Sequence, residues 1–138
     1  MSKFFLPHGN WNISLNNKTL VINGKGGWNE EAAIEFTEDL KKAAVPLLND
    51  KWAILTILDN WELATPECEK HFKALAEWFV AHNCIRECHV YDGSYTKDNL
   101  LERYVPENKD QDTFINRKFN KRQDAISWLE SSGFKVEL

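Results

Sequence analysis

The stretch KWAILTILDNWELATPECEKHFKALAEWFVAHN, residues 51–83, decides the fold. Residues 52–58 form an almost unbroken apolar run, which is typical of a central strand covered on both faces of a sheet. Asp59 and Asn60 favour turns and are expected to end this strand. A helix should begin at Thr65-Pro66-Glu67, because Thr caps free N–H groups, Pro suits the first turn and Glu complements the helix dipole. Apolar residues then recur at helical spacing as far as Phe79.

Strand and helix patterns alternate on both sides of this unit. A hairpin at residues 11–22 and a helix at 29–46 precede it. Strands are expected after it at 85–91, 113–119 and 134–138, and helices at 96–106 and 120–133. Gly24, Gly26 and Gly27 are expected to break the second strand of the hairpin, and residues 107–112 to form a polar loop. The order predicts an α/β fold: a mostly parallel sheet with an antiparallel N-terminal hairpin strand, about five strands and about four helices. With no repeat or linker in view, residues 1–138 are expected to form a single domain.

Composition narrows the classes of function. The chain has 138 residues, 17 of them basic and 21 acidic, and a net charge of −4, which gives no long-range attraction to nucleic acid. Apolar content of 43% is that of a folded protein. Three cysteines at irregular spacing favour a reduced, cytoplasmic protein. The apolar patch near residue 5 is too short for a signal peptide, and no run reaches the ~20 residues of a membrane span.

The order of elements and three short motifs resemble the SpoIIAA-like superfamily, which includes the STAS domains, and most closely its small single-domain bacterial members. The motifs are Gly-Trp-Asn-Glu-Glu at 27–31, the strand over 52–59 that ends in an acid, and Phe119 followed by Ala-Ile-Ser-Trp-Leu at 125–129. The resemblance implies a hairpin followed by a β-α superhelix. It requires the strands at 51–58 and 85–91 to be parallel neighbours.

The resemblance also implies a regulatory site. STAS antagonists are switched by phosphorylation at the start of the helix that follows the central strand, and the matching residue here is Thr65. The sequence has Ala64-Thr65-Pro66-Glu67 where those proteins carry an Asp-Ser-Ser-Gly type of motif. Thr65 is therefore a candidate phosphoacceptor or a plain helix cap. Lipid carriers of related fold hold apolar ligands, which suggests a second type of function.

Two strand-end loops are the candidate binding surface. In open α/β sheets, ligands bind beyond the carboxyl ends of the strands, where the loops after residues 58 and 90 should converge. The candidate residues are Asp59, Asn60, Trp61, Glu62, Tyr91, Asp92 and Tyr95. An exposed Trp and two Tyr beside acids would suit a protein partner. The alternative is ordinary turn chemistry, with the aromatic rings folded onto the core.

Other candidate sites are weaker. The Cys and His residues lack zinc-ligand spacing, so no metal is predicted. The basic residues around Phe119 are expected to be a solvated helix start. No catalytic motif is present, so the protein is predicted to be non-enzymatic and without a cofactor.

Two function hypotheses follow. The first is a cytoplasmic bacterial STAS-like domain, monomer or homodimer, that acts in signalling or regulation by binding a protein partner. The alternative is a binder of a small apolar or amphipathic ligand between sheet and helices, in a pocket lined by Trp28, Phe36, Trp61 and Phe79. A ligand binder should show an apolar pocket, and an enzyme should show a titratable pair with perturbed pKa values in a cleft.

Overall fold

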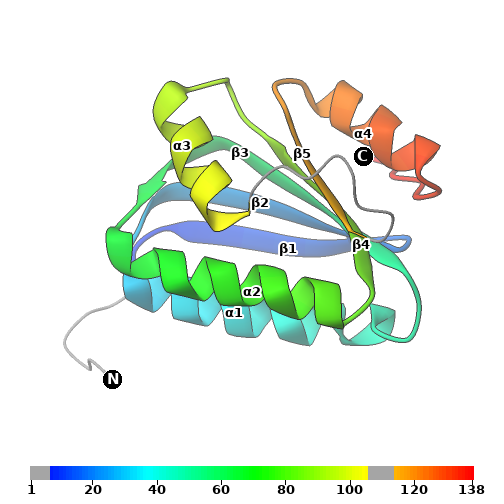
Figure 1. The fold of residues 1–138 in the computed structure, drawn as a ribbon, viewed down its shortest axis with the longest axis horizontal. Helices are drawn as coiled ribbons and strands as arrows, with labels where there is room; N and C mark the ends of the chain where they lie inside the picture. The colour runs from blue at the N-terminus through cyan, green and yellow to red at the C-terminus, as the bar shows by residue number, and fades with distance from the viewer. Residues whose placement is uncertain (1–6, 106–113) are drawn as a thin grey trace.

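A computed structural model of the protein describes residues 7–105 and 114–138, and Figure 1 shows its fold. Within these ranges, five strands form one sheet in the order β1-β2-β3-β4-β5. They are β1 (Asn10–Asn16), β2 (Thr19–Trp28), β3 (Trp52–Ala64), β4 (Cys84–Val90) and β5 (Ile115–Phe119). Strands β1 and β2 are antiparallel, and every other neighbouring pair is parallel, including β3 with β4. The predicted α/β architecture is therefore confirmed.

Four α-helices and two 3₁₀ turns connect the strands in the described ranges. They are α1 (Glu30–Ala44), α2 (Glu69–Ala81), α3 (Tyr95–Tyr104) and α4 (Arg122–Ser131), with η1 (Val45–Leu47) and η2 (Pro66–Cys68). The side chain of Asn29, where the sequence predicts a helix to start, accepts a hydrogen bond from the backbone N–H of Ala32 and caps α1. The cap of α3 is Ser94, two residues before the helix start predicted at residue 96. No helix of the described residues is long and apolar enough to cross a membrane.

The sheet carries a different core on each face. Helices α1, α2 and α3 cover one face, where the largest buried side chains include Trp52, Trp61 and Phe79. Helix α4 and the C-terminal segment cover the other face, where β3 and β4 present aliphatic residues and Cys88. Figure 1 shows α1 and α2 side by side along one face, with α4 away from them. Because side chains alternate along a strand, each buried strand contributes to both cores.

Strands β2 and β3 are both longer than predicted. Strand β3 continues through Asp59 and Asn60 to Ala64, and β2 continues through its glycines to Trp28. The two extensions pair with each other, with register shifts at residues 23–25 and 26–27. Mutual backbone pairing outweighs the turn preference of Asp59, so the turn predicted there is wrong. A Cβ atom on Gly24 would lie 3.1 Å from Cδ2 of Leu58, so this glycine permits close packing rather than a strand end.

The C-terminal segment is not the predicted final strand. Phe134 and Val136 are buried in the second core, but residues 134–138 join no ladder. The side-chain amide of Asn16 donates to the Glu137 carbonyl (2.7 Å) and accepts from the Glu137 N–H (3.0 Å). A side chain therefore replaces the strand ladder here. The polar loop predicted at 107–112 and the segment before residue 7 lie outside the described residues.

Candidate functional site

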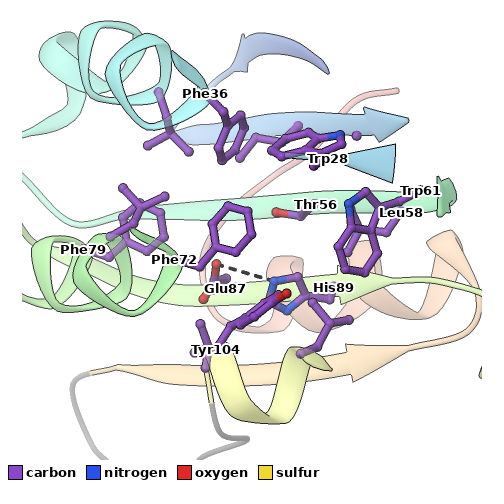
Figure 2. Close-up of a pocket in the computed structure, with 16 residues that line it drawn as sticks. Trp28, Phe36, Thr56, Leu58, Trp61, Phe72, Phe79, Glu87, His89 and Tyr104 are labelled. Carbon is purple, nitrogen blue, oxygen red and sulfur yellow. Dashed lines mark ion pairs between the residues drawn. The ribbon is translucent and has the colours of Figure 1, made fainter. Parts of the chain in front are cut away.

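A cavity of about 80 Å³ lies between the first face of the sheet and helices α1, α2 and α3. Figure 2 shows its aromatic walls, with Trp28 and Phe36 on one side and Phe72, Phe79 and Tyr104 on the other. The lining residues are Ile22, Gly24, Trp28, Phe36, Leu40, Thr56, Leu58, Trp61, Phe72, Leu75, Phe79, Glu87, His89, Leu101, Tyr104 and Val105. All four residues expected to line an apolar pocket are among them.

Three side chains make what we call the polar floor of this cavity: Thr56 of β3 and Glu87 and His89 of β4. Thr56 pairs with His89 across the two parallel strands, so their side chains stand on the same face. Glu87 and His89 are two residues apart on β4, which places both toward the cavity. Their exposed fractions are only 4% and 6%.

Strand β5, the neighbour of β4 in the sheet, supplies hydrogen-bond partners to the polar floor. Asn116 pairs with Glu87 in register, and Lys118 pairs with His89. The Asn116 amide nitrogen lies 3.0 Å from Oε1 of Glu87 and 3.3 Å from Nδ1 of His89. Nζ of Lys118 lies 3.4 Å from Oδ1 of Asn116 and 3.3 Å from a carboxylate oxygen of Glu102. The floor is thus held by a chain of hydrogen bonds that runs through Asn116 and Lys118 to Glu102.

Burial shifts both titratable groups of the floor toward their neutral forms. Loss of hydration raises the pKa of Glu87 to about 7, against the opposing effects of the Asn116 hydrogen bond and the Lys118 charge. The same loss of hydration lowers the pKa of His89 to about 3, and the charge of Lys118 lowers it further. At neutral pH, His89 is therefore uncharged and Glu87 is near its titration midpoint.

The predicted strand-end surface is assembled only in part. Asp59, Asn60 and Glu62 are exposed, whereas Trp61 is 4% exposed and lines the cavity, so its predicted exposure is wrong. The indole of Trp61 turns inward because β3 continues past residue 60 with a register shift against β2, which brings Trp61 onto the same face as Leu58. Its neighbours in the sequence therefore face solvent while the ring joins the core.

The second predicted loop is divided in the same way. Tyr91 is buried and donates its hydroxyl to Asp98, whereas Asp92 is exposed and Tyr95 is 79% exposed. Lys97 connects the two strand ends, since its Nζ lies 3.2 Å from the Leu58 carbonyl and 3.7 Å from Oδ1 of Asp92. The loops converge as expected, but their large aromatic rings, apart from that of Tyr95, are turned inward.

Thr65 is exposed at the start of η2, four residues before α2. Its hydroxyl lies 3.6 Å from Sγ of Cys68 and makes no capping hydrogen bond to the backbone. The short 3₁₀ turn separates Thr65 from the first turn of α2, so the side chain is not the cap that the sequence suggested.

The sequence interpretation did not single out Glu87, Asn116 or Lys118 as site residues. One signal was available: Glu87 and His89 alternate with Cys88 and Val90 within a strand, which places two polar residues on one buried face. His89 was considered only as a metal ligand. In residues 7–105 and 114–138, no group of three His, Cys, Asp or Glu side chains is placed to hold a metal ion.

Comparison with known proteins defines the fold. Neither a family model nor a curated protein matches the sequence. The structure is similar to that of an uncharacterized protein from the DUF3478 family with a SpoIIAA-like fold, from Shewanella loihica PV-4. The TM-score is 0.63 at 15% sequence identity, and the match covers 94% of this chain and 98% of that one. At this identity the likeness establishes the fold alone. The chain has a SpoIIAA-like fold, as its sequence motifs indicated.

Proposed function

We propose that this protein binds a small, largely apolar ligand in the cavity between the sheet and helices α1, α2 and α3. The observation that carries this proposal is an aromatic cavity of about 80 Å³ with buried polar groups on its floor. Ligand sites are typically apolar spaces with a few convergent polar groups. The cavity is smaller than the roughly 150 Å³ space that takes benzene in an engineered protein, so it suits a compact molecule or a compact head group.

A ligand in this space would stabilise the protein. Protein interiors are close-packed, and at about 24 cal/mol per Å³ the contacts that fill 80 Å³ would contribute up to roughly 2 kcal/mol. Burial makes the charged form of Glu87 costly. A ligand that hydrogen-bonds to the floor would offset part of that cost.

A protein partner at the strand-end loops is the second candidate function. The observation in its favour is Tyr95, which is 79% exposed beside the exposed Asp92. Burial of Trp61 and Tyr91 removes the other large rings from that surface. A signalling role would rest on analogy of fold, and a fold alone does not determine function. Glu87 and His89 meet the expectation given above for an enzyme, a titratable pair with perturbed pKa values in a cleft, but the pair alone specifies no reaction. We therefore place ligand binding first.

The test of the cavity uses methylenecyclobutane, a compact apolar probe, followed by amide chemical shifts in NMR titration. We expect saturable shifts in residues around Trp28, Thr56 and Leu75. Leu75→Phe places extra ring atoms in the cavity and should abolish the saturable response. Ala74→Phe adds the same ring one residue away at an exposed position of α2 and should leave binding intact. Absence of binding to the wild type, or equal binding to Leu75→Phe, would refute the proposal.

A further inference from the structure

Three polar atoms on the cavity floor have no hydrogen-bond partner among the described residues: Oγ1 of Thr56, Nε2 of His89 and Oε2 of Glu87. The last two lie 3.7 Å apart, which is beyond hydrogen-bond distance. Figure 2 shows both side chains reaching the space between Phe72 and Tyr104. Buried polar atoms in proteins are nearly always paired, so two adjacent ones at a cavity indicate what the cavity would hold.

The contact between Lys118 and Asn116 fixes the orientation of the Asn116 amide, and this orientation determines which of the two atoms donates. An ammonium group can only donate, so the Asn116 atom beside it must be the carbonyl oxygen Oδ1. The amide nitrogen of Asn116 then donates to Oε1 of Glu87 and to Nδ1 of His89. Since Nδ1 accepts, the proton of the neutral His89 ring is on Nε2. The floor therefore offers the cavity one donor, His89 Nε2–H, and one acceptor, the Glu87 carboxylate oxygen Oε2.

We propose, on the basis of the ligand-binding function above, that the cavity selects a neutral hydroxyl group, whose oxygen accepts from His89 Nε2–H and donates to Oε2 of Glu87. A single oxygen can reach both atoms, because each bond needs only about 2.8 Å and the two atoms are 3.7 Å apart. The Thr56 hydroxyl can rotate to donate or accept and so does not oppose this arrangement.

Other head groups fit the floor less well. A ketone or ether oxygen can accept from His89 but has no proton for the Glu87 carboxylate. An anionic head would face that carboxylate, and an ammonium head could donate to Glu87 but has no lone pair to accept from His89 Nε2–H. The ligand class that remains is a compact alcohol with an apolar body.

Three probes of similar size distinguish recognition of the apolar body from recognition of the head group. They are cyclobutanol, cyclobutanone and methylenecyclobutane. At pH 8, where Glu87 is ionised, we expect the wild type to bind cyclobutanol about tenfold more tightly than cyclobutanone, a typical effect of one hydrogen bond to a charged group. If none of the three binds, the proposed function fails. If all three bind with equal affinity, the cavity function stands and hydroxyl selection is refuted.

Glu87→Gln provides a sharper test, because the structure predicts a reversal. In this variant the side-chain carbonyl at position 87 should keep the hydrogen bond from Asn116, which turns the new amide N–H groups toward the cavity beside His89 Nε2–H. Two donors match a ketone oxygen, so the variant should prefer cyclobutanone to cyclobutanol. Glu77→Gln, at an exposed position of α2, should keep the wild-type order. An unchanged order in Glu87→Gln would overturn the proposal.

Measuring the same probe preference in the wild type at pH 5.5 tests the role of Glu87 without a mutation. Protonation makes Glu87 a donor, so the preference for cyclobutanol should fall between pH 8 and pH 5.5. The titratable groups near Glu87 are His89, Cys84 and Cys88 on its own strand and Lys118 on β5. Tyr104 of α3, whose pKa is raised to about 12, also lines the cavity. The residues that α1 and α2 contribute to the cavity lining are all apolar. A preference that is constant with pH would contradict the assignment of Glu87 as the acceptor.

Discussion

Replacing Glu87 with Gln should change how the stability of the protein depends on pH. Burial moves the pKa of Glu87 from 4.5 in the unfolded chain to about 7 in the folded protein. Between these values the folded protein binds the proton more tightly, so unfolding releases it and stability falls as the pH rises. This contribution of Glu87 is greatest below pH 4.5 and is lost as the pH passes 7.

The size of the effect follows from the shift. Each pH unit within this window is worth about 1.4 kcal/mol, so the full shift corresponds to roughly 3 kcal/mol. His89 acts in the opposite direction, because its pKa falls from 6.5 to about 3 and its neutral form is favoured by folding. The two slopes nearly cancel in the wild type between pH 4.5 and 6.5. Glu87→Gln removes the slope due to Glu87, so the slope due to His89 is no longer cancelled.

The assay is urea unfolding followed by tryptophan fluorescence from pH 5 to 7.5, with wild type and variant measured in the same buffers. The free energy of unfolding of Glu87→Gln, minus that of the wild type, should increase by roughly 2 kcal/mol over this range. Subtraction removes the titration of all groups that both proteins share. Glu77→Gln, with its exposed carboxyl on α2, should show a constant difference. A constant difference for Glu87→Gln would refute the assignment of Glu87 as a buried, desolvated acid.

Three further outcomes are expected. His89→Gln should show the opposite trend, losing roughly 2 kcal/mol relative to the wild type between pH 5 and 7.5 in the same assay. Leu75→Phe should cost little stability because the cavity accepts the added atoms. Leu129→Phe, in the second core, should lower the free energy of unfolding by about 1–3 kcal/mol. Similar losses in the two variants would argue against the cavity. Asn29→Ala should cost about 1 kcal/mol because it removes a cap, whereas Thr65→Ala should stay within about 0.5 kcal/mol, and thermal melts would show the contrast.

The parts of the fold that could be predicted depend on local signals. The apolar run at 52–58 indicated a doubly covered strand, and that part of β3 is buried throughout in the structure. Asn29 followed by two glutamates indicated the start of α1, because capping acts over three residues of the chain. The mostly parallel sheet with an antiparallel hairpin strand followed from the alternation of strands and helices, and the pairing of the strands at 51–58 and 85–91 followed from the resemblance.

The errors arise where partners distant in the sequence decide the structure. Asp59 has a local turn preference, but β2 offers its extension a matching strand about 35 residues earlier, and pairing prevails. Phe134 and Val136 alternate as in a strand, yet the segment is held at the backbone of Glu137 by the side chain of Asn16, which is more than 100 residues away. Neither partner could be recognised from the residues near the error.

The polar floor was missed for a related reason. Glu87 carries no signal of its own within the predicted strand at 85–91, and the residues that make its burial tolerable, Asn116 and Lys118, belong to a short strand whose sequence pattern is weak. Only the parallel pairing of β4 with β5 brings them into contact. A buried acid in a strand therefore predicts hydrogen-bond partners on the neighbouring strand.

The contrast between the two faces of β4 argues that the polar floor serves a ligand. On the face toward α4, β4 and β3 carry the small and aliphatic side chains of Ala53, Leu55, Ile57, Cys88 and Val90. On the cavity face, Glu87 and His89 carry desolvation costs that apolar residues of similar volume would avoid, and such replacements are often stabilising. The register of β4 does not require them, because parallel ladders with β3 and β5 already hold the strand on both sides. What the pair adds to the fold is a donor and an acceptor facing an aromatic space, and binding a hydroxyl group would make use of both.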